Sequence, residues 1–221
     1  FKGAQGSAQD LTALQSMIQR YADSAETLVM NLFPAYREHI KRANTSFRPF
    51  AIEGRVSSYR KDDTRLHADS FPSNPTCGTR LLRVFCNVNP VGLPRTWRVG
   101  EPFADMAHRF LPTTRGLFPL QSWLMHRLKI TKRRRTEYDH RMLQLHDNMK
   151  ADLDYQRNAP QQTVHIMPGT TWIVYSDQVL HAAMSGQHMF EQTFHVPVAA
   201  LYHPERSPLH VLESMLNQKL I

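Results

Sequence analysis

Two groups of short apolar segments, separated by a long polar stretch, constrain most strongly what this chain can fold into. The first group lies within residues 49–100 and the second within residues 163–200, and proline, glycine or charged residues bound the segments. Short apolar runs between turn residues predict the strands of a β-sandwich or barrel. Strands are expected at residues 50–59, 64–69, 80–89, 96–99, 163–167, 171–175, 179–183 and 189–198.

The N-terminal region shows a helical pattern instead. From Asp10, which we expect as the N-cap, apolar residues recur every three or four positions as far as Leu32. Pro34 should interrupt this helix before another turn or two. Asn44-Thr45-Ser46 then has the composition of a loop. Residues 1–48 are therefore predicted to be a helical prelude.

Two further helical regions complete the expected fold. Residues 101–160 form a helical insertion, and residues 207–220 form a C-terminal helix that Ser207-Pro208 begins. One long helix of the insertion is expected to bury Tyr138, Met142, Leu145, Met149 and Leu153. The prediction is a mainly β fold with α decoration, a double-stranded β-helix or jelly-roll core forming a single domain over residues 1–221.

Composition indicates the cellular compartment of the protein and the charge of its binding partner. Cys77 and Cys86 are too few for a disulfide framework, which favours a reducing, cytoplasmic location. No apolar run approaches the length of a membrane span, and no signal peptide follows Phe1. The net charge of +8 points to an anionic partner, either nucleic acid, a phosphorylated lipid surface or an acidic sugar.

The sequence His67-Ala68-Asp69 offers the first two ligands of a metal site. Residues two apart in a strand point to the same face, so the imidazole and the carboxylate can reach one ion. A distant histidine would complete the two-histidine, one-carboxylate arrangement that leaves positions of Fe(II) open. His-x-Asp alone is weak evidence, because surface strands often carry both residues by chance.

His181 is the candidate third ligand. It follows a strand that ends in Ser176-Asp177 and a short turn, which resembles the presentation of the distal ligand in iron- and 2-oxoglutarate-dependent oxygenases. It lies 114 residues after His67, a gap that has room for the helical insertion. The competing histidines His165, His188 and His195 lack this turn context.

An oxygenase of this type also needs a cation for the far carboxylate of 2-oxoglutarate, because an arginine fork matches a planar carboxylate. The usual arginine after the distal histidine is absent here, and Arg83 is the proposed substitute. The end of its strand resembles the strand that follows His-x-Asp in prolyl-hydroxylase-like enzymes, and this resemblance implies that Arg83, Phe85 and Asn87 point inward. Asn87 is expected to help bind the cosubstrate, with Gln192 and Thr193 as neutral helpers. Alternatively, Arg83 forms a structural ion pair with Glu53 or Glu191, and Arg80 is the reserve anchor.

Four stretches of the chain together resemble the hydroxylases of Kdo, 3-deoxy-D-manno-oct-2-ulosonic acid, over nearly the whole sequence. They are residues 66–73, 80–90, 97–103 and 190–195. The resemblance implies hydroxylation at C3 of Kdo in the lipid A inner core of lipopolysaccharide of Gram-negative bacteria, with Fe(II), 2-oxoglutarate and O₂. His67, Asp69 and His181 would then hold the iron.

The net positive charge of the chain would then help to bind the acidic, lipid-linked sugar. Arg55, Arg60, Arg95 and Arg98 are the candidate residues for binding it. The cationic run 132–135 is the candidate for peripheral contact with the anionic inner membrane. Two alternatives stay open: an oxygenase of nucleic acid or protein, disfavoured because no aromatic stacking pattern interleaves the basic residues, and a non-catalytic jelly-roll binding protein.

Overall fold

The structure of the protein, a computed structural model, describes residues 2–221. Its strands form a major sheet with the order β1-β7-β2-β5 and a minor sheet with the order β4-β3-β6, and all pairings are antiparallel. The strands are β1 (Lys41–Arg48), β2 (Arg80–Asn87), β3 (Arg95–Gly100), β4 (Gln161–Ile166), β5 (Thr171–Tyr175), β6 (His181–Ser185) and β7 (Met189–Val196). The helices are α1 (Ala8–Leu32), α2 (Phe103–Phe110), α3 (Gln121–Arg127), α4 (Glu137–Ala151), α5 (Leu153–Asn158) and α6 (Pro208–Leu216). The predicted mainly β fold with helices at both ends and in the middle is confirmed.

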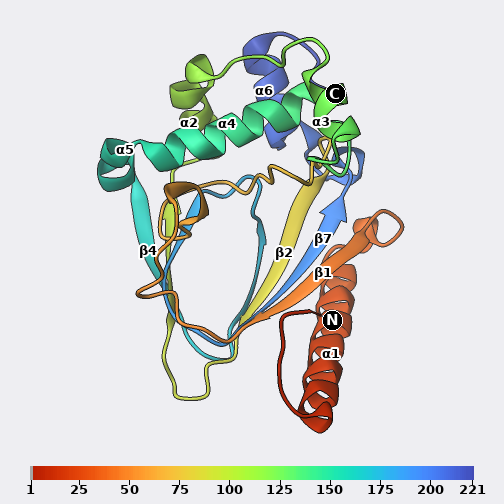
Figure 1. The fold of residues 1–221 in the computed structure, drawn as a ribbon, viewed down its shortest axis with the longest axis vertical. Coiled ribbons are helices and arrows are strands. Elements are labelled where there is room, and N and C mark those ends of the chain that lie inside the picture. The colour runs from red at the N-terminus through yellow and green to blue at the C-terminus, as the bar shows by residue number, and fades with distance from the viewer. Residues whose placement is uncertain (1) are drawn as a thin grey trace.

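Helix α1 covers the outer face of the major sheet (Figure 1). Side chains alternate along a strand, so Leu82 and Val84 of β2 pack with α1 on this face, while Phe85 points to the opposite face. The Tyr21 hydroxyl also donates a hydrogen bond of 2.8 Å to the backbone carbonyl of Val84. The N-cap of α1 is Ser7 rather than the expected Asp10, because the Ser7 hydroxyl accepts from the Asp10 amide.

Strand β1 lies in the region that was predicted to be a helical prelude, so this prediction is corrected. Residues 41–48 were expected to be the end of a helical region and a loop, but they pair with β7 at the edge of the major sheet. The register shifts between Arg42 and Thr45, as in a β-bulge. The Thr45 hydroxyl donates to the Gln192 side chain, and Phe47 packs against Phe190. These partners come from the far end of the chain, so local composition misled the prediction.

Two strands predicted in the first group do not form. Residues 50–59 are irregular, and residues 64–69 make only an isolated bridge, between His67 and His181. The backbone of Leu66 instead bonds to a side chain: its amide donates to the Gln156 carbonyl at 2.7 Å and its carbonyl accepts from the Gln156 amide at 3.0 Å. A side chain of α5 thus replaces a neighbouring strand.

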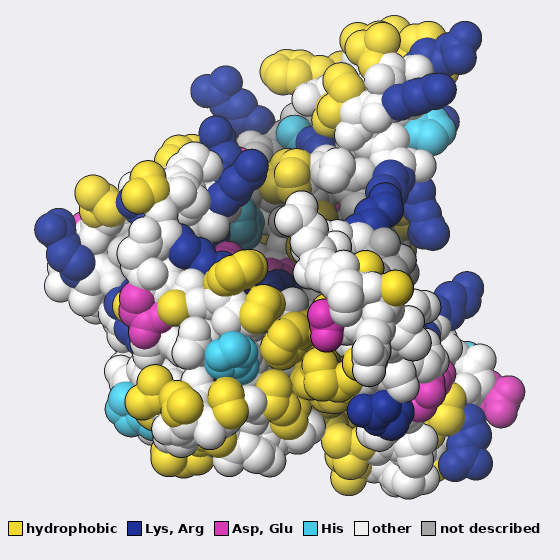
Figure 2. Space-filling view, turned by 60° about the horizontal axis from the view of Figure 1, so that its bottom comes forward, with side chains coloured by type: hydrophobic (Ala, Val, Ile, Leu, Met, Phe, Trp, Pro, Cys, Tyr) yellow, Lys and Arg dark blue, Asp and Glu magenta, His cyan; other side chains and the backbone are white. Residues whose placement is uncertain are grey.

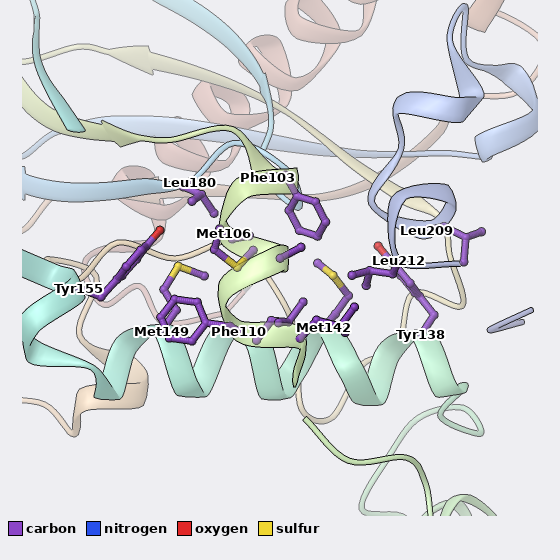
Figure 3. Close-up of a cluster of buried hydrophobic side chains, with 14 of the residues drawn as sticks. Phe103, Met106, Phe110, Tyr138, Met142, Met149, Tyr155, Leu180, Leu209 and Leu212 are labelled. Atoms are coloured by element: carbon purple, nitrogen blue, oxygen red, sulfur yellow. The ribbon is translucent and has the colours of Figure 1, made fainter. Parts of the chain in front are cut away.

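The helical insertion and α6 build a second core, which lies across one end of the sheets (Figures 1 and 3). Figure 3 shows Met142 of α4 beside Leu212 of α6, and Met106 of α2 beside Met149 of α4. Ala68 and Leu180, each a neighbour of a candidate metal ligand, are buried in the same cluster. This core therefore fixes the backbone of the candidate site.

The predicted long helix is divided in two. Helix α4 ends at Ala151, and the Asp152 side chain accepts from the Tyr155 amide as the N-cap of α5. Leu153, which was expected in the core, is 54% exposed. An aspartate cap within a helical pattern favours a new helix start over continuation. The predicted start of the C-terminal helix is confirmed, since Ser207 caps α6.

Candidate metal centre

The structure brings His67, Asp69 and His181 together. One ligand atom of each lies within 4.8 Å of the others. The backbones of His67 and His181 exchange two hydrogen bonds, of 3.0 and 2.9 Å, which places the two imidazoles on directly opposed residues. Asp69 is fixed in turn by its amide, which donates to the Ser176 carbonyl at 2.7 Å. Backbone pairing therefore brings together two candidate ligands, His67 and His181, that lie far apart in the sequence.

Hydrogen bonds orient both imidazoles for metal binding. Nδ1 of His67 lies 2.7 Å from the Arg65 carbonyl, and Nδ1 of His181 lies 2.8 Å from the Val179 carbonyl. A carbonyl only accepts, so each Nδ1 carries the proton and each Nε2 presents its lone pair. Nε2 of His67 lies 3.7 Å from Oδ1 of Asp69. Trp97 stacks on His181 and holds the plane of its ring.

The charge states also suit a divalent cation. Burial, together with His181, lowers the pKa of His67 well below its usual value, so this imidazole is neutral at pH 7. Burial tends to raise the pKa of Asp69, but the positive charge of the Arg83 guanidinium opposes it, and that pKa lies well below its usual range. Two imidazole nitrogens and one carboxylate form a donor set that fits Fe(II).

A third histidine, His146 of α4, lies beside this set and was missed by the sequence analysis. Its ring meets His67 edge-to-face at 5.5 Å, and its Nδ1 lies 2.9 Å from the Asp147 carboxylate. A helical position in the insertion gave no signal for this proximity. The competing histidines lie elsewhere: His165 contacts Thr96, and neither His188 nor His195 lines the metal pocket.

A pocket of about 210 Å³ opens from the three residues between the two sheets. Figure 2 shows a hollow of such mixed character, with His, acidic and basic side chains in its depth and hydrophobic groups around it. Phe85, Trp97 and Met189 supply the apolar part of the wall. Its charged lining consists of Arg48, Asp63, Asp69, Arg83, Arg95 and Glu191.

Arg83 lies in this pocket, facing inward as expected. One of its terminal nitrogens is 3.3 Å from Asp69 and 3.0 Å from Glu191, so the alternative prediction of an ion pair with Glu191 also holds. Glu53 instead faces the Gly186 amide. Nε of Arg83 has no hydrogen-bond partner among residues 2–221. The guanidinium therefore retains a donor for a ligand in the pocket.

Arg95 and Arg48 are the other two cations of the pocket. Arg95 is buried, its Nε has no partner within the described chain, and one terminal nitrogen lies 3.4 Å from the Gly186 carbonyl. Burial and the neighbouring cations Arg48 and Arg55 lower its pKa to about 10. Arg48 contacts Glu191 at 2.7 Å. A buried guanidinium without a carboxylate partner is costly unless an anion binds it.

The other residues expected near 2-oxoglutarate separate into two groups. Thr193 pairs with Arg83 on the pocket side of the sheet. Asn87 does not reach the pocket, because its amide donates to the carbonyls of Leu93 and Ile166 and its oxygen accepts from Asn89.

The structure also corrects the expectations for Gln192 and for Arg80, the reserve anchor. Gln192 alternates with Thr193 along β7, so it points to the outer face and bonds to the Ala43 carbonyl. Arg80 binds the buried Asp177 carboxylate at 2.7 Å and Gln178 at 2.7 Å, and it lies over the Tyr175 ring. It is a structural cation.

Of the four arginines expected to bind the sugar, only Arg95 lines the metal pocket. Arg55 and Arg60 lie on the irregular segment 51–64, where Arg55 bonds to nearby backbone and Arg60 pairs with Asp147 at 2.8 Å. Arg98 alternates with Trp97 on β3, so it points away from the pocket and donates to the Thr64 carbonyl at 2.8 Å. The structure therefore does not place Arg98 at the metal pocket.

The family model described as 3-deoxy-D-manno-oct-2-ulosonic acid (Kdo) hydroxylase matches residues 1–219. The chain belongs to the Kdo hydroxylase family. Among solved structures, it is similar to the Kdo hydroxylase KdoO, a non-heme Fe(II) α-ketoglutarate-dependent dioxygenase, in complex with α-ketoglutarate and Fe(III), at 51% identity and a TM-score of 0.97. That match covers 100% of this chain and 75% of the KdoO chain.

KdoO structures with cobalt(II) and with succinate and Fe(III) match equally well, at 51% identity and TM-scores of 0.97 and 0.96, each covering 100% of this chain and 74% of the other. No curated protein matched the sequence. The α-ketoglutarate in these Kdo hydroxylases is the 2-oxoglutarate that the sequence analysis expected. The family and its oxygenase character thus agree with the sequence-based prediction.

Proposed function

We propose that this chain is an Fe(II)- and 2-oxoglutarate-dependent dioxygenase that hydroxylates C3 of Kdo linked to lipid A. The observation that carries the proposal is the buried set of His67, Asp69 and His181 beside an arginine-lined pocket. Relatives at 51% identity that are Kdo hydroxylases, solved with Fe(III) and α-ketoglutarate, support it.

His67, Asp69 and His181 would hold the iron on one side and leave its other side open to the pocket. The bound iron with 2-oxoglutarate and O₂ supplies the oxidising chemistry that places a hydroxyl group on an unactivated carbon. The protein's own residues bind, orient and exclude water. No protein acid or base is required for such a step, which agrees with a pocket whose charged groups are arginines and carboxylates.

The charge of the pocket suits 2-oxoglutarate. Three guanidiniums and three carboxylates balance, so a divalent cation would leave a surplus of two positive charges, which one dicarboxylate neutralises. We assign the far carboxylate to Arg83, as the sequence predicted, and add Arg95 as a second anchor, because each has an Nε without a partner in residues 2–221. Arg48 pairs with the other carboxylate oxygen of Glu191 at 2.7 Å, so Glu191 does not depend on Arg83 alone for a counter-ion. Phe85 and Trp97 form part of the apolar wall of the metal pocket.

The acidic sugar would enter past segment 51–64, where Arg55 and Arg60 lie. A second cavity of about 460 Å³, lined by Ile52, Arg55 and Asp63 among others, adjoins the metal pocket through Asp63. Either arginine can exchange its present partner for a sugar carboxylate, because Arg60 is 60% exposed at its side chain and Arg55 bonds only to carbonyls. Arg98 has no part in this proposal.

A further part of the proposal is peripheral contact with an anionic membrane through the segment around α3. No helix among residues 2–221 is long and apolar enough to span a membrane. The segment exposes six large apolar side chains: Phe118, Leu120, Trp123, Leu124, Leu128 and Ile130. No Asp or Glu occurs in residues 106–136, whereas Arg127, Lys129 and the run 132–134 are exposed cations. An aromatic and apolar surface rimmed by cations fits a membrane interface.

Arg135, the last residue of the run expected at the membrane, is a correction. Its side chain is buried and donates to the Pro72 carbonyl, so it ties the segment to the loop after Asp69.

The membrane contact is tested by replacing Trp123 and Leu124 by Ser, which should lower co-sedimentation of the protein with vesicles that contain anionic lipid. Turnover of a short, detergent-free Kdo substrate should stay unchanged, and vesicle binding equal to the native protein's would contradict this part.

The function is tested by incubating the purified protein with Fe(II), 2-oxoglutarate, O₂ and Kdo-linked lipid A. Mass spectrometry should show a product heavier by one oxygen atom, with succinate formed in equal amount. Asp69→Ala should yield neither product while keeping the far-ultraviolet circular dichroism of the native protein. Succinate formation without oxidised sugar would retain the oxygenase and refute the substrate.

A further inference from the structure

A second polar pocket, of about 160 Å³, lies outside the metal site. It is lined by Lys41, Asn74, Pro75, Thr76, Thr79, Arg133, His195 and Pro197. Three of these side chains are basic and none is acidic. The neutral polar members contribute hydroxyl and amide donors. We call this group the basic pocket.

The cations of the basic pocket have no counter-ion. Within residues 2–221, no carboxylate lies within 4.0 Å of Lys41 or Arg133, whereas Arg48 and Arg83 of the metal pocket are both paired with Glu191. Desolvation and the Arg133 charge lower the pKa of His195, so the pocket is already electropositive without its protonation. Unpaired cations converging on a cavity predict an anionic ligand.

The basic pocket and the metal pocket share one face of the major sheet. Glu191 and His195 are both on the inner side of β7, four residues apart, which is about 13 Å along a strand. Lys41 is paired directly with His195, so its side chain emerges on the same face. The segment from Asp69 to Thr76 connects the two sites, since Asp69, Phe71, Asn74 and Thr76 line one small cavity between them.

We propose that the basic pocket binds a phosphate group of the lipid-linked substrate while its Kdo residue lies at the metal. This inference rests on the proposed function for the identity of the substrate. A phosphomonoester carries close to two negative charges at pH 7 and offers three acceptor oxygens, which suits one ammonium, one guanidinium and several neutral donors. A separation of about 13 Å corresponds to a group on a neighbouring sugar rather than on the oxidised one.

Kinetics with two substrates test the assignment. For the variant Lys41→Ala/Arg133→Ala, we expect the KM for phosphorylated Kdo–lipid A to rise about tenfold or more, because two charge-assisted hydrogen bonds are lost. The KM for the same lipid after enzymatic removal of its phosphates should not change. The kcat and the KM for 2-oxoglutarate should also match the native protein. Arg133→Glu should give the larger rise because it adds repulsion.

The matched control is Lys2→Ala/Arg20→Ala, which removes the same charge at exposed positions near the N-terminus. It separates a local site from a general loss of electrostatic attraction. An equal rise of KM in the control and in the basic-pocket variant would overturn the proposal. An unchanged KM in the basic-pocket variant would overturn it as well.

A readout independent of turnover uses ³¹P NMR titration with an acyl-free glucosamine disaccharide phosphate. The native protein should broaden or shift the phosphate resonance, and Lys41→Ala/Arg133→Ala should not. This result supports the phosphate site even if no lipid is hydroxylated, which would refute the proposed function alone. If the variant binds the disaccharide phosphate normally but loses binding to phosphatidylglycerol vesicles, the pocket holds a membrane phospholipid and the substrate assignment is overturned.

Discussion

Strand β2 carries two buried arginines, one at its start and one in its middle, in opposite situations. Arg80 is fully engaged: Asp177, Gln178 and the Tyr175 ring occupy its guanidinium. Arg83, three residues later, bridges Asp69 and Glu191 with one nitrogen and leaves Nε without a partner among residues 2–221. Both are buried. The difference shows that the hydrogen bonds a buried cation lacks, rather than its burial, indicate where a ligand binds.

The largest loss of stability is expected at Arg80, whose guanidinium is bound to Asp177 and Gln178. Arg80→Ala leaves the Asp177 carboxylate buried without its partner, which should destabilise the protein by about 3–5 kcal/mol. Urea unfolding followed by circular dichroism measures the loss. The KM for 2-oxoglutarate of the protein that remains folded should equal the native value. A selective rise in that KM would instead make Arg80 the anchor.

Arg83→Ala is expected to act mainly on the cosubstrate. Loss of a charge-assisted contact of about 1.5–3 kcal/mol should raise the KM for 2-oxoglutarate by roughly 10- to 100-fold. Glu191 keeps Arg48 at 2.7 Å, so the unfolding free energy should fall less than in Arg80→Ala. Anaerobic Fe(II) titration should show that the metal still binds. A variant that loses iron but retains its 2-oxoglutarate KM would contradict the assignment.

Arg95 is a third buried arginine, and it has no carboxylate partner among residues 2–221. Arg95→Met replaces an uncompensated charge by an apolar chain of similar length, so it should raise the unfolding free energy in the absence of 2-oxoglutarate by about 1 kcal/mol. The same variant should bind 2-oxoglutarate more weakly. Thermal unfolding with and without saturating 2-oxoglutarate measures both effects. Decreased stability in both conditions would mean that Arg95 is structural.

The smallest effect is expected for Arg98, which faces away from the metal pocket. Arg98→Ala removes hydrogen bonds to backbone carbonyls and should cost about 1 kcal/mol of stability. The KM for the Kdo substrate should be unchanged, whereas Arg60→Ala should raise it. A substrate KM that rises only in Arg98→Ala would restore the original expectation from the sequence.

Much of the candidate site was accessible from the sequence because its signals are local. His67 and Asp69 are two residues apart, and the turn before His181 marks it, so two residue types, one spacing and one turn sufficed to nominate the three ligands. The inward direction of Arg83 followed from the resemblance of its strand to that of prolyl-hydroxylase-like enzymes. Gln192 and Thr193 were nominated together although alternation places neighbours on opposite faces, and the structure keeps only Thr193 on the pocket side.

The sequence by itself determined the candidate ligands, the mainly β fold with helices at its ends and middle, and the family. These depend on residue type, period and short spacing, which the chain displays directly. Only the tertiary structure decided which buried polar groups are engaged. Asn87 bonds to the Ile166 carbonyl, Gln156 takes the place of a strand beside Leu66, and His146 meets His67, each through partners far away in sequence. A buried group's role depends on whether its hydrogen bonds are complete, and that is a property of the packed molecule.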